Sequence, residues 1–367
     1  MTPIGLLLDM LTYRRPAGSQ TEADFIDRFI VPLGTICDDY GNHHVWIANP
    51  DGSPSRMLWS CHTDTVHDRA GKQTVHYDAT MGVIALSKRS KRGKWVPFAN
   101  GVSRDSSNCL GADDTAGVFL CMGMIKAGVP GHYVFHYGEE MGGQGSGDLA
   151  RYEPALLANA DIAIAFDRRG SGDIITHQFG RRCASEAFAE SLAAALYAAD
   201  PALDYRSCRG SYTDTAEYMD HIPECSNLSV GYANEHSANE ILYSHHTFRL
   251  LAVMIKLDVS ALVVTRVPEP ECAPTYSYVV HDHDDRTLCT CGHAQGDHWP
   301  PQGDCTWCLC DGFESEDDSM QDAPPYVDDY LYPEYAEVQA ALSFAHSRPP
   351  IDRRCFPHGL IIPWNKV

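Results

Sequence analysis

The chain has 367 residues, 44% of them hydrophobic, which is an ordinary globular composition with enough apolar content to bury at least one large core. Its formal net charge of -21 repels polyanions, so we do not expect nucleic acid as a partner. The most apolar later stretch, residues 250–264, contains Lys256 and Asp258 and is too short to span a bilayer, so no membrane anchor is expected either.

Residues 1–11 are apolar but contain Asp9, and they lack the basic leader and the small-residue cleavage site of a secretion signal. We expect a first helix there. The chain has fourteen cysteines, but a protein of this size needs no disulfide scaffold, and most of them are scattered singly through apolar segments. These patterns predict reduced, buried thiols and a cytoplasmic protein.

Apolar periodicity then predicts alternating helices and strands up to about residue 266. Helices are expected at residues 21–33, 116–127, 149–158, 185–198 and 237–257. Strands are expected at residues 36–48 (two strands), 57–60, 77–87, 95–98, 132–137, 161–166 and 227–232, with one more near 174. This alternation is typical of parallel βαβ units. The predicted fold class is therefore α/β, a three-layer sandwich with a mixed, mostly parallel central sheet flanked by helices.

The strand expected at residues 57–60 leads directly into His62, and Asp64 follows two residues later. An isolated histidine is more often structural than functional. Here the imidazole leaves the end of a strand, which is where open α/β folds bind their ligands. We interpret His62 as a metal ligand and Asp64 as the carboxylate that orients its ring.

Two adjacent carboxylates, Asp113 and Asp114, precede the helix expected at 116–127, and Gly111 and Gly117 lie on either side of them. One interpretation is that Asp113 simply caps the helix. The glycines would also let the backbone approach a metal closely, and a pair of metals needs one bridging carboxylate. We therefore predict that Asp114 is the bridging ligand and that Asp113 is the helix cap.

Glu139 and Glu140 follow the strand expected at 132–137 and precede a glycine-rich loop. Adjacent acids at the end of a buried strand are costly unless a cation or a proton-transfer role offsets their desolvation. A pair of surface glutamates is the alternative. The neighbouring residues favour one glutamate that binds metal and one that moves protons.

Two further candidates complete the set. Asp167 follows the strand expected at 161–166, and His236 comes just before the last expected helix. Asp167 alone would be explained equally well by a pair with an arginine, and His245 and His246 compete with His236 from within that helix. The position at the end of an apolar run favours ligand roles for Asp167 and His236.

Taken in order, these motifs resemble the pattern of the co-catalytic zinc exopeptidases, the superfamily of aminopeptidases, tripeptidases, carboxypeptidases and aminoacylases. The resemblance covers about residues 1–266 and consists of His-x-Asp, Gly-Ala-x-Asp, Glu-Glu, a strand-end Asp and a late His. Only about 70 residues separate Asp167 from His236, which leaves no room for the lid domain that many members insert there. The resemblance therefore implies a lid-less aminopeptidase-like or tripeptidase-like chain that does not dimerise through a lid.

By position, the resemblance implies two zinc ions in the active site, held by two imidazoles and three carboxylates: His62, Asp114, Glu140, Asp167 and His236. Asp114 bridges the two ions. His62 and Asp167 complete the first zinc site. Glu140 and His236 complete the second.

Glu139 then becomes the general base, and Asp64 belongs to the catalytic group through its hold on the first histidine. The implied reaction is hydrolysis of a peptide bond in a small peptide, most simply as an aminopeptidase. An amidohydrolase that deacylates an N-acyl amino acid, or a carboxypeptidase-like enzyme, is the first alternative. A catalytically silent member that binds proteins is the second.

Residues that select the substrate are harder to name. His177 and Arg181, with Arg182, are candidates to hold a substrate carboxylate or oxyanion, although arginines on a surface need no such role. Tyr212 and Asp214 precede the last ligand and are candidates to meet a free amino group.

Beyond the exopeptidase-like unit at 1–266, we place a linker and a compact Cys/His module at 267–325 and a C-terminal helix and tail at 326–367. The module has more soft ligands than one structural zinc requires. The favoured four are Cys289, Cys291, Cys305 and Cys308, with His293, His298 and Cys310 as alternates. A closed zinc site of this kind folds a small surface that can contact a protein partner. Redox-active thiols or disulfides are the alternative.

Overall fold

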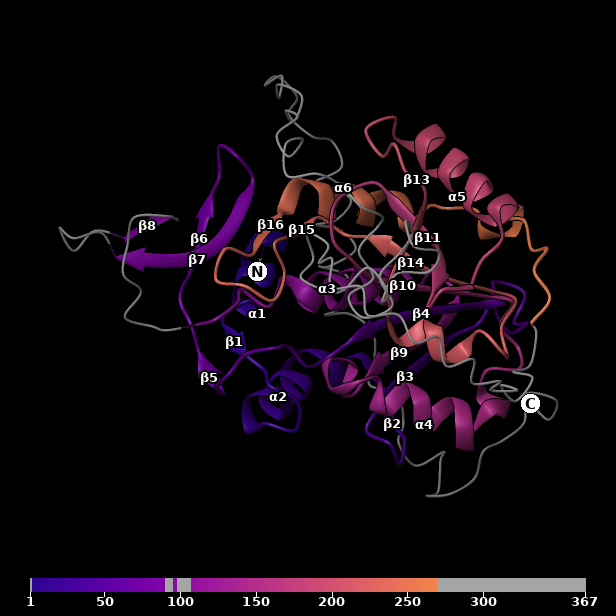
Figure 1. Cartoon of the computed structure of the whole chain (residues 1–367), viewed down its shortest axis with the longest axis horizontal. Helices are drawn as coiled ribbons and strands as arrows, with labels where there is room; N and C mark the ends of the chain where they lie inside the picture. Colours follow the sequence, from indigo (N-terminus) through magenta and orange to yellow (C-terminus); the bar gives the residue numbers. More distant parts are fainter. Residues whose placement is uncertain (1, 90–94, 98–106, 269–367) are drawn as a thin grey trace, which may run out of the picture. The chain divides into compact units, whose positions relative to one another are not determined.

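A nine-stranded sheet is the largest element of the computed structural model, which describes residues 2–89, 95–97 and 107–268 (Figure 1). The strand order is β12-β11-β14-β10-β4-β9-β3-β2, and β13 pairs with β11. The strands are β2 Ile36–Cys37, β3 His43–Ile47, β4 Met57–His62, β9 Gly131–His136, β10 Ile162–Arg168, β11 Asp173–Gln178, β12 Arg181–Arg182, β13 Arg206–Arg209 and β14 Glu224–Ser229.

The four central strands β14, β10, β4 and β9 are parallel to one another, whereas β2, β3, β11 and β12 join the sheet in antiparallel pairs. Strands β4 and β9 are buried along their whole length because both faces of the sheet are covered. Parallel strands all end at the same edge of a sheet. The segments that follow β4, β9, β10 and β14 therefore meet at one edge.

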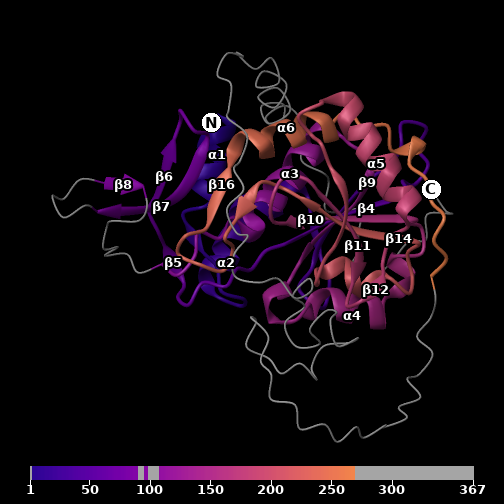
Figure 2. The same cartoon turned by 45° about the horizontal axis from the view of Figure 1, so that its top comes forward.

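Helices cover both faces of this sheet, as Figures 1 and 2 show. On one face α3 (Ala112–Ala127) packs against β4 and β10, with α1 (Pro3–Met10) and α6 (Ser244–Met254) packed against α3. On the other side lies α4 (Gln144–Tyr152), which packs against the short 3-10 helix η5 (Asp214–Tyr218). Helix α5 (Glu186–Ala199) packs on β11 and β13. The mixed sheet flanked by helices confirms the predicted α/β sandwich.

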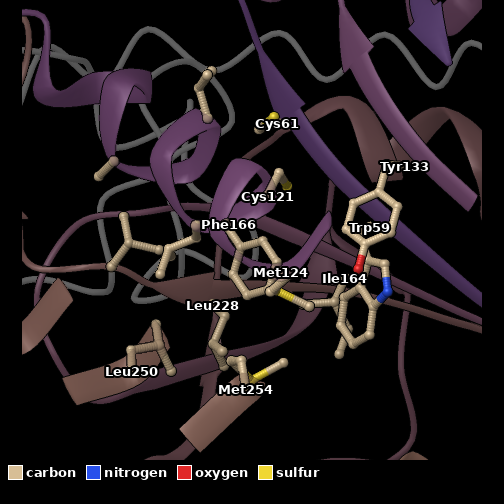
Figure 3. Packing of buried hydrophobic residues seen from close by; sticks show 14 of the residues in the cluster. Trp59, Cys61, Cys121, Met124, Tyr133, Ile164, Phe166, Leu228, Leu250 and Met254 are labelled. Atoms are coloured by element: carbon tan, nitrogen blue, oxygen red, sulfur yellow. The ribbon is translucent and has the colours of Figure 1, made fainter. Parts of the chain in front are cut away.

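The hydrophobic core lies between α3 and the sheet (Figure 3). Trp59 of β4 stacks on Phe166 of β10 with a centroid distance of 5.8 Å, and Met124 of α3 belongs to the same cluster. The first turns of α3 lie unusually close to β10. A Cβ atom added at Gly117 would lie 2.3 Å from the carbonyl oxygen of Phe166, so only glycine allows this approach. This approach brings the start of α3 to the end of β10.

The helix predicted at 21–33 consists of three consecutive segments. They are α2 (Gln20–Phe25), a π-helical turn η1 (Ile26–Ile30) and a 3-10 turn η2 (Val31–Leu33). Pro32 has no N–H to donate within an α-helix, so the last turn cannot continue the α pattern. Three further 3-10 turns are η3 Glu139–Met141, η4 Pro154–Leu156 and η6 Val259–Ala261.

A second sheet corrects two of the sequence predictions. It has the order β15-β16-β7-β6, with β8 paired to β7, and comprises β6 Val75–Asp78, β7 Val83–Arg89, β8 Trp95–Pro97, β15 Tyr232–Ala233 and β16 Ile241–Tyr243. The strand predicted at 77–87 is thus two strands. The helix predicted at 237–257 begins only at Ser244, because residues 241–243 pair with β7 instead. A small two-stranded sheet joins β1 (Tyr13–Arg14) and β5 (Gly71–Lys72).

The segment between Asp167 and His236 forms no separate domain. Its strands β11, β12, β13 and β14 belong to the main sheet. None of the described helices combines the length and apolar character needed to cross a lipid bilayer. In the same part of the chain, all seven cysteines are free thiols and five of them are buried. The predicted Cys/His module and the C-terminal helix and tail lie outside the described residues.

Candidate functional site

Acidic and imidazole side chains converge where the parallel strands end. They come from β4, from the start of α3, from η3, from β10 and from the loop after β15: His62, Asp113, Glu139, Glu140, Asp167 and His236. Ligand atoms within each of three overlapping groups lie within 4.8 Å of one another. The groups are His62 with Asp113 and Asp167, His62 with Glu139 and Glu140, and Asp113 with Glu140 and His236. Segments more than 170 residues apart in sequence therefore meet in one cluster.

His62 is the last residue of β4 and is completely buried. Its Nδ1 lies 3.3 Å from Oδ1 of Asp64 and 3.2 Å from the Asp64 carbonyl oxygen. Its Nε2 faces the cluster, 3.1 Å from Oδ1 of Asp113 and 3.5 Å from Oδ1 of Asp167. Asp64 thus lies on the side of the ring away from the cluster, where a carboxylate orients an imidazole.

Asp113, and not Asp114, occupies the middle of the cluster. The Oδ1 atom of Asp113 lies 3.1 Å from Nε2 of His62, and its Oδ2 atom lies 3.2 Å from Nε2 of His236. The Asp114 carboxylate accepts hydrogen bonds from the backbone N–H groups of His62 (3.1 Å) and Gly117 (2.9 Å). Asp114 belongs to none of the three groups, and its carboxylate holds α3 against the end of β4, so the geometry favours Asp113 over Asp114 for the bridging role.

Local backbone geometry explains why the helical pattern misassigned this pair. Asp113 (ψ 106°) and Asp114 (ψ 48°) both have non-helical backbone angles, and the peptide between them is cis. Asp113 is not the helix cap that was expected, because Gly111 occupies the N-cap position in a left-handed conformation. The two carboxylates therefore do not follow the side-chain directions of a regular first turn.

His236 lies on a loop whose backbone is left-handed at Asn234 (φ 56°) and again at His236 (φ 58°). Its Nε2 atom is 3.0 Å from Oε1 of Glu140. About half of its side chain is exposed, with 51% of the side-chain surface accessible, so the cluster is open to solvent on this side. The rival His245 lies at the start of α6 and belongs to none of the clustered groups described above.

Asp167 is held by hydroxyl groups as well as by the cluster. Thr213 donates a hydrogen bond to its Oδ2 atom (2.7 Å), and Tyr232 donates one to its Oδ1 atom (3.0 Å). Asn227 of β14 accepts a hydrogen bond from the Asp167 N–H and donates one to its carbonyl oxygen. These contacts orient the carboxylate toward His62.

Glu139 and Glu140 lie in the short turn η3, directly after β9. The two carboxylate oxygens of Asp64 each accept one backbone N–H, from Glu139 and from Glu140, at 3.2 Å. Asp64 therefore fixes both the ring of His62 and the turn that carries the glutamates. The sequence predicted only the first of these contacts.

Glu240 is a residue of this region that the sequence analysis missed. It is completely buried, and its carboxylate accepts the backbone N–H groups of Leu110, Gly111 and Asp113 at 2.7 to 3.0 Å. This contact fixes the segment that leads into Asp113. No local sequence signal marks Glu240, because its partners lie about 130 residues earlier in the chain.

The charges of the cluster are unbalanced within its own residues. Four carboxylates face two imidazoles. Burial opposes the charge of His62, but Asp167, Asp113 and Asp64 together outweigh it and raise the pKa of this imidazole well above its ordinary value. Hydrogen bonds to Asp113 and Glu140 raise the pKa of His236 to about 11. The pKa values of both histidines are therefore raised by the excess of negative charge around them.

The pKa values of two carboxylates in the cluster are raised as well, in part by neighbouring negative charges. Burial raises the pKa of Glu139 well above the ordinary carboxyl value, and the charges of Asp167 and Asp214 add to the effect. Burial and the charge of Asp113 raise the pKa of Asp167 to about 6. Arg15 is buried behind the site and donates to the Thr63 carbonyl at 2.8 Å, but it has no contact with the four clustered carboxylates among the hydrogen bonds and ion pairs of the described residues.

All the clustered residues except His62 line a cavity of about 290 Å³. Besides clustered side chains, its lining includes Arg168, Arg169, Ile175, Gln178, Gly210, Ser211, Tyr212, Asn227, Tyr232 and Glu235. Of the five residues predicted to select the substrate, only Tyr212 is in this lining. Asp214 is fully buried, and its charge contributes to the raised pKa of Glu139.

His177 and Arg181 do not line the cavity. Arg181 forms an ion pair with Asp220 at 2.6 Å, and Arg182 forms one with Glu186. The strands β6, β7 and β8 contribute no described residue to the lining either. The arginines at the cavity are instead Arg168 and Arg169, directly after Asp167.

A buried histidine beside the segment 107–111 predicts acid sensitivity. His67 is 3% exposed, and burial, followed by the charge of Arg15, lowers its pKa to about 4 from an ordinary 6.5. The unfolded chain therefore takes up this proton first as the pH falls. The stability that neutral His67 contributes is complete above pH 6.5 and is lost on the way down to pH 4, by about 3 kcal/mol.

We expect the variant His67→Gln to show a correspondingly weaker fall in unfolding free energy between pH 7 and pH 4, measured by urea denaturation at each pH. His221→Gln, on an exposed residue, is the control. An identical pH dependence in the His67 variant and the parent chain would contradict this assignment.

Comparison with known proteins gives the fold but no family. No model of a known protein family matches the chain, and no curated protein matches it. Among solved structures, the aminopeptidase PepT from Bacillus cereus ATCC 10987 is similar with a TM-score of 0.50 and 13% identity, covering 69% of this chain and 96% of that one. The chain therefore shares the fold of an aminopeptidase.

Two further solved structures are similar. A tripeptidase from Staphylococcus aureus has a TM-score of 0.49 and 14% identity, covering 69% of this chain and 96% of that one. The TET1 peptidase of Pyrococcus horikoshii has a TM-score of 0.47 and 15% identity, covering 72% of this chain and 100% of that one.

Proposed function

We propose that this chain is a metal-dependent exopeptidase that hydrolyses a peptide bond of a small peptide, acting as an aminopeptidase. One observation carries the proposal. Overlapping groups of ligand atoms are formed by His62, Asp113, Glu139, Glu140, Asp167 and His236, and all of these residues except His62 line one cavity. The aminopeptidase fold supports the same function.

The donor set fits two zinc ions. Imidazole nitrogen and carboxylate oxygen are ligands that zinc binds readily, and the uncompensated negative charge of the cluster calls for cations. Asp113 would bridge the ions, His62 and Asp167 would complete one site, and Glu140 and His236 the other. As Lewis acids, bound zinc ions would polarise the scissile carbonyl and stabilise negative charge on its oxygen.

Residues of the chain would carry out the proton transfers and hold the reacting groups in place. Glu139 takes a proton from the attacking water and passes it to the nitrogen of the leaving amine. Burial raises the pKa of Glu139, and a higher pKa makes this carboxylate a stronger base. Asp64 positions Glu139 by accepting its backbone N–H and that of Glu140.

Deacylation of an N-acyl amino acid is the second candidate function. It is favoured by Arg168 and Arg169, which line the cavity and form ion pairs with Asp173 and Glu235, both at 3.0 Å. A substrate carboxylate would compete for these guanidinium groups. In an aminopeptidase of dipeptides, the same arginines would meet the carboxyl end of the substrate.

The two functions are separated by comparing free-amine dipeptides and tripeptides with N-acetylated amino acids as substrates. We expect hydrolysis of the free-amine peptides, followed by quantification of the released amino acids. Hydrolysis confined to the acylated compounds would establish the second candidate. No turnover of either set by the zinc-loaded chain would leave a silent, protein-binding member of the fold.

Metal removal is the direct test of the metal centre. We expect exhaustive dialysis against a chelator to lower turnover by at least about 10²-fold, because the ions supply several kcal/mol of transition-state stabilisation. Addition of zinc should restore turnover, and metal analysis should then find two zinc ions per chain beyond any ion that the predicted Cys/His module holds. Undiminished turnover in the chelated, metal-free protein would contradict the proposal.

A further inference from the structure

The tight turn between β11 and β12 contains an aromatic residue where turn chemistry disfavours one. Strands β11 and β12 pair Gln178 with Arg181, so Phe179 and Gly180 form a two-residue hairpin loop. Both loop residues have left-handed backbones, with φ of 50° at Phe179 and 69° at Gly180. Such turns favour asparagine, aspartate or glycine at the first position, because a bulky side chain is strained there.

The ring of Phe179 does not gain burial in return for this strain. Its side chain is 56% exposed, which places it among the exposed large hydrophobic residues of the described chain. The ring lies against that of Tyr212, with a centroid distance of 4.8 Å and an interplanar angle of 40°. Folding alone therefore does not account for an aromatic residue at this position.

The backbone holds this turn beside the catalytic cavity. The N–H of Phe179 donates to the Ser211 carbonyl at 2.9 Å, and the N–H of Gly210 donates to the His177 carbonyl at 3.0 Å. Gly210, Ser211 and Tyr212 all line the cavity. The turn is thus fastened to the segment that forms one side of the cavity.

Ile175 also lines the cavity, next to Gly210. A Cβ atom at Gly210 would lie 2.8 Å from Cγ2 of Ile175, so the glycine lets the isoleucine occupy this wall. Phe179 is not itself in the lining, but its ring extends this apolar surface from Tyr212. We name Ile175, Tyr212 and Phe179 the apolar wall. Charged residues of the lining, including Arg168, Arg169 and Glu235, come from other segments: the end of β10, the loop after it and the loop after β15.

We propose that the apolar wall binds a large apolar side chain of the substrate, on a residue that flanks the scissile bond. This inference rests on the proposed peptidase function and deepens it by naming the substrate class. An exposed ring beside a cavity loses unfavourable contact with water when an apolar side chain covers it. A polar or small side chain would gain nothing there, so the wall favours peptides with residues such as leucine or phenylalanine.

The variant Phe179→Asn separates this role from a structural one. Asparagine is preferred in this turn, so the variant should unfold at the same or a higher temperature than the parent chain. The ratio of kcat/KM for phenylalanine-containing over alanine-containing dipeptides should nevertheless fall about 10-fold. Both X-Ala and Ala-X series are assayed, so that the flanking position is identified by the series that responds.

Two comparisons complete the test. Phe179→Leu keeps an apolar side chain and should retain most of the selectivity, whereas Tyr197→Ala removes an exposed aromatic residue of α5 outside the lining and should leave the ratio unchanged. An unchanged selectivity ratio in Phe179→Asn, for both peptide series, would overturn the proposal. Loss of folding stability in Phe179→Asn, with a uniform loss of activity on all peptides, would overturn it as well.

If the proposed peptidase function is wrong, the parent chain itself will turn over no peptide, which distinguishes that failure from a failure of the apolar wall. Binding of L-phenylalanine and L-alanine to the zinc-loaded chain, measured by calorimetry, then tests the wall without turnover. We expect tighter binding of phenylalanine in the parent chain and a loss of that preference in Phe179→Asn. Equal affinities in the parent chain would refute the wall.

Discussion

Replacing Glu139 by glutamine is expected to lower kcat by about 10²-fold or more while the chain keeps its fold and its metal. Glutamine has nearly the same shape but cannot take a proton from water. The Asp64 contact to the backbone N–H of residue 139 does not involve the side chain, so the turn η3 should persist. Steady-state kinetics, metal analysis and urea denaturation of the same preparation measure the three properties.

The control for this substitution is Glu190→Gln on the exposed face of α5, which should have wild-type kinetics. The pH profile adds a second readout, since loss of the base should remove the acidic limb of the kcat/KM curve. Turnover by Glu139→Gln within a few-fold of the parent enzyme would rule out the general-base role, whatever the substrate.

Replacing Asp113 by asparagine is expected to abolish binding of the metal pair, with a loss in affinity of more than about 100-fold and with activity lost in parallel. Asp113 is within hydrogen-bond distance of both His62 and His236, so it links the two halves of the cluster. An amide lacks the negative charge that a bridging ligand supplies. Competition with a chromogenic chelator measures the affinity, and urea denaturation without metal checks the fold.

The neighbouring substitution Asp114→Asn is the matched control, because it makes the same chemical change one residue away. Asp114 is fully buried and accepts two backbone N–H groups, so the variant should lose about 1–3 kcal/mol of stability. Its metal affinity should fall much less than that of the Asp113 variant. The reverse order of metal affinities would restore the role that the sequence pattern assigned to Asp114.

The strands that end at candidate metal ligands could be predicted from the sequence, because a buried strand is recognised by its local run of apolar residues. The apolar runs before His62, Glu139 and Asp167 are buried strands, and parallel strands deliver whatever follows them to one edge of the sheet. The order of these elements along the chain therefore indicated a cluster before any distance was known. The α/β class followed from the same alternation.

The choice between Asp113 and Asp114 was not predictable from the pattern. Helical periodicity assigns side-chain directions only where the backbone is helical, and neither residue has helical angles. The direction is set by tertiary contacts: Glu240 holds the N–H of Asp113, and the N–H of His62 holds the carboxylate of Asp114. The strand β16 was missed for a similar reason, because its pairing with β7 overrides a helical pattern.

The amino-acid sequence by itself thus determined the α/β class and which segments bring acid and imidazole groups to one edge, since apolar burial and strand direction act locally. Only the tertiary structure decided which of two adjacent aspartates faces the cluster, that Arg168 and Arg169 rather than His177 and Arg181 line the cavity, and that Phe179 lies beside it. Those features depend on contacts between residues far apart in the chain, whose pairing no local pattern records.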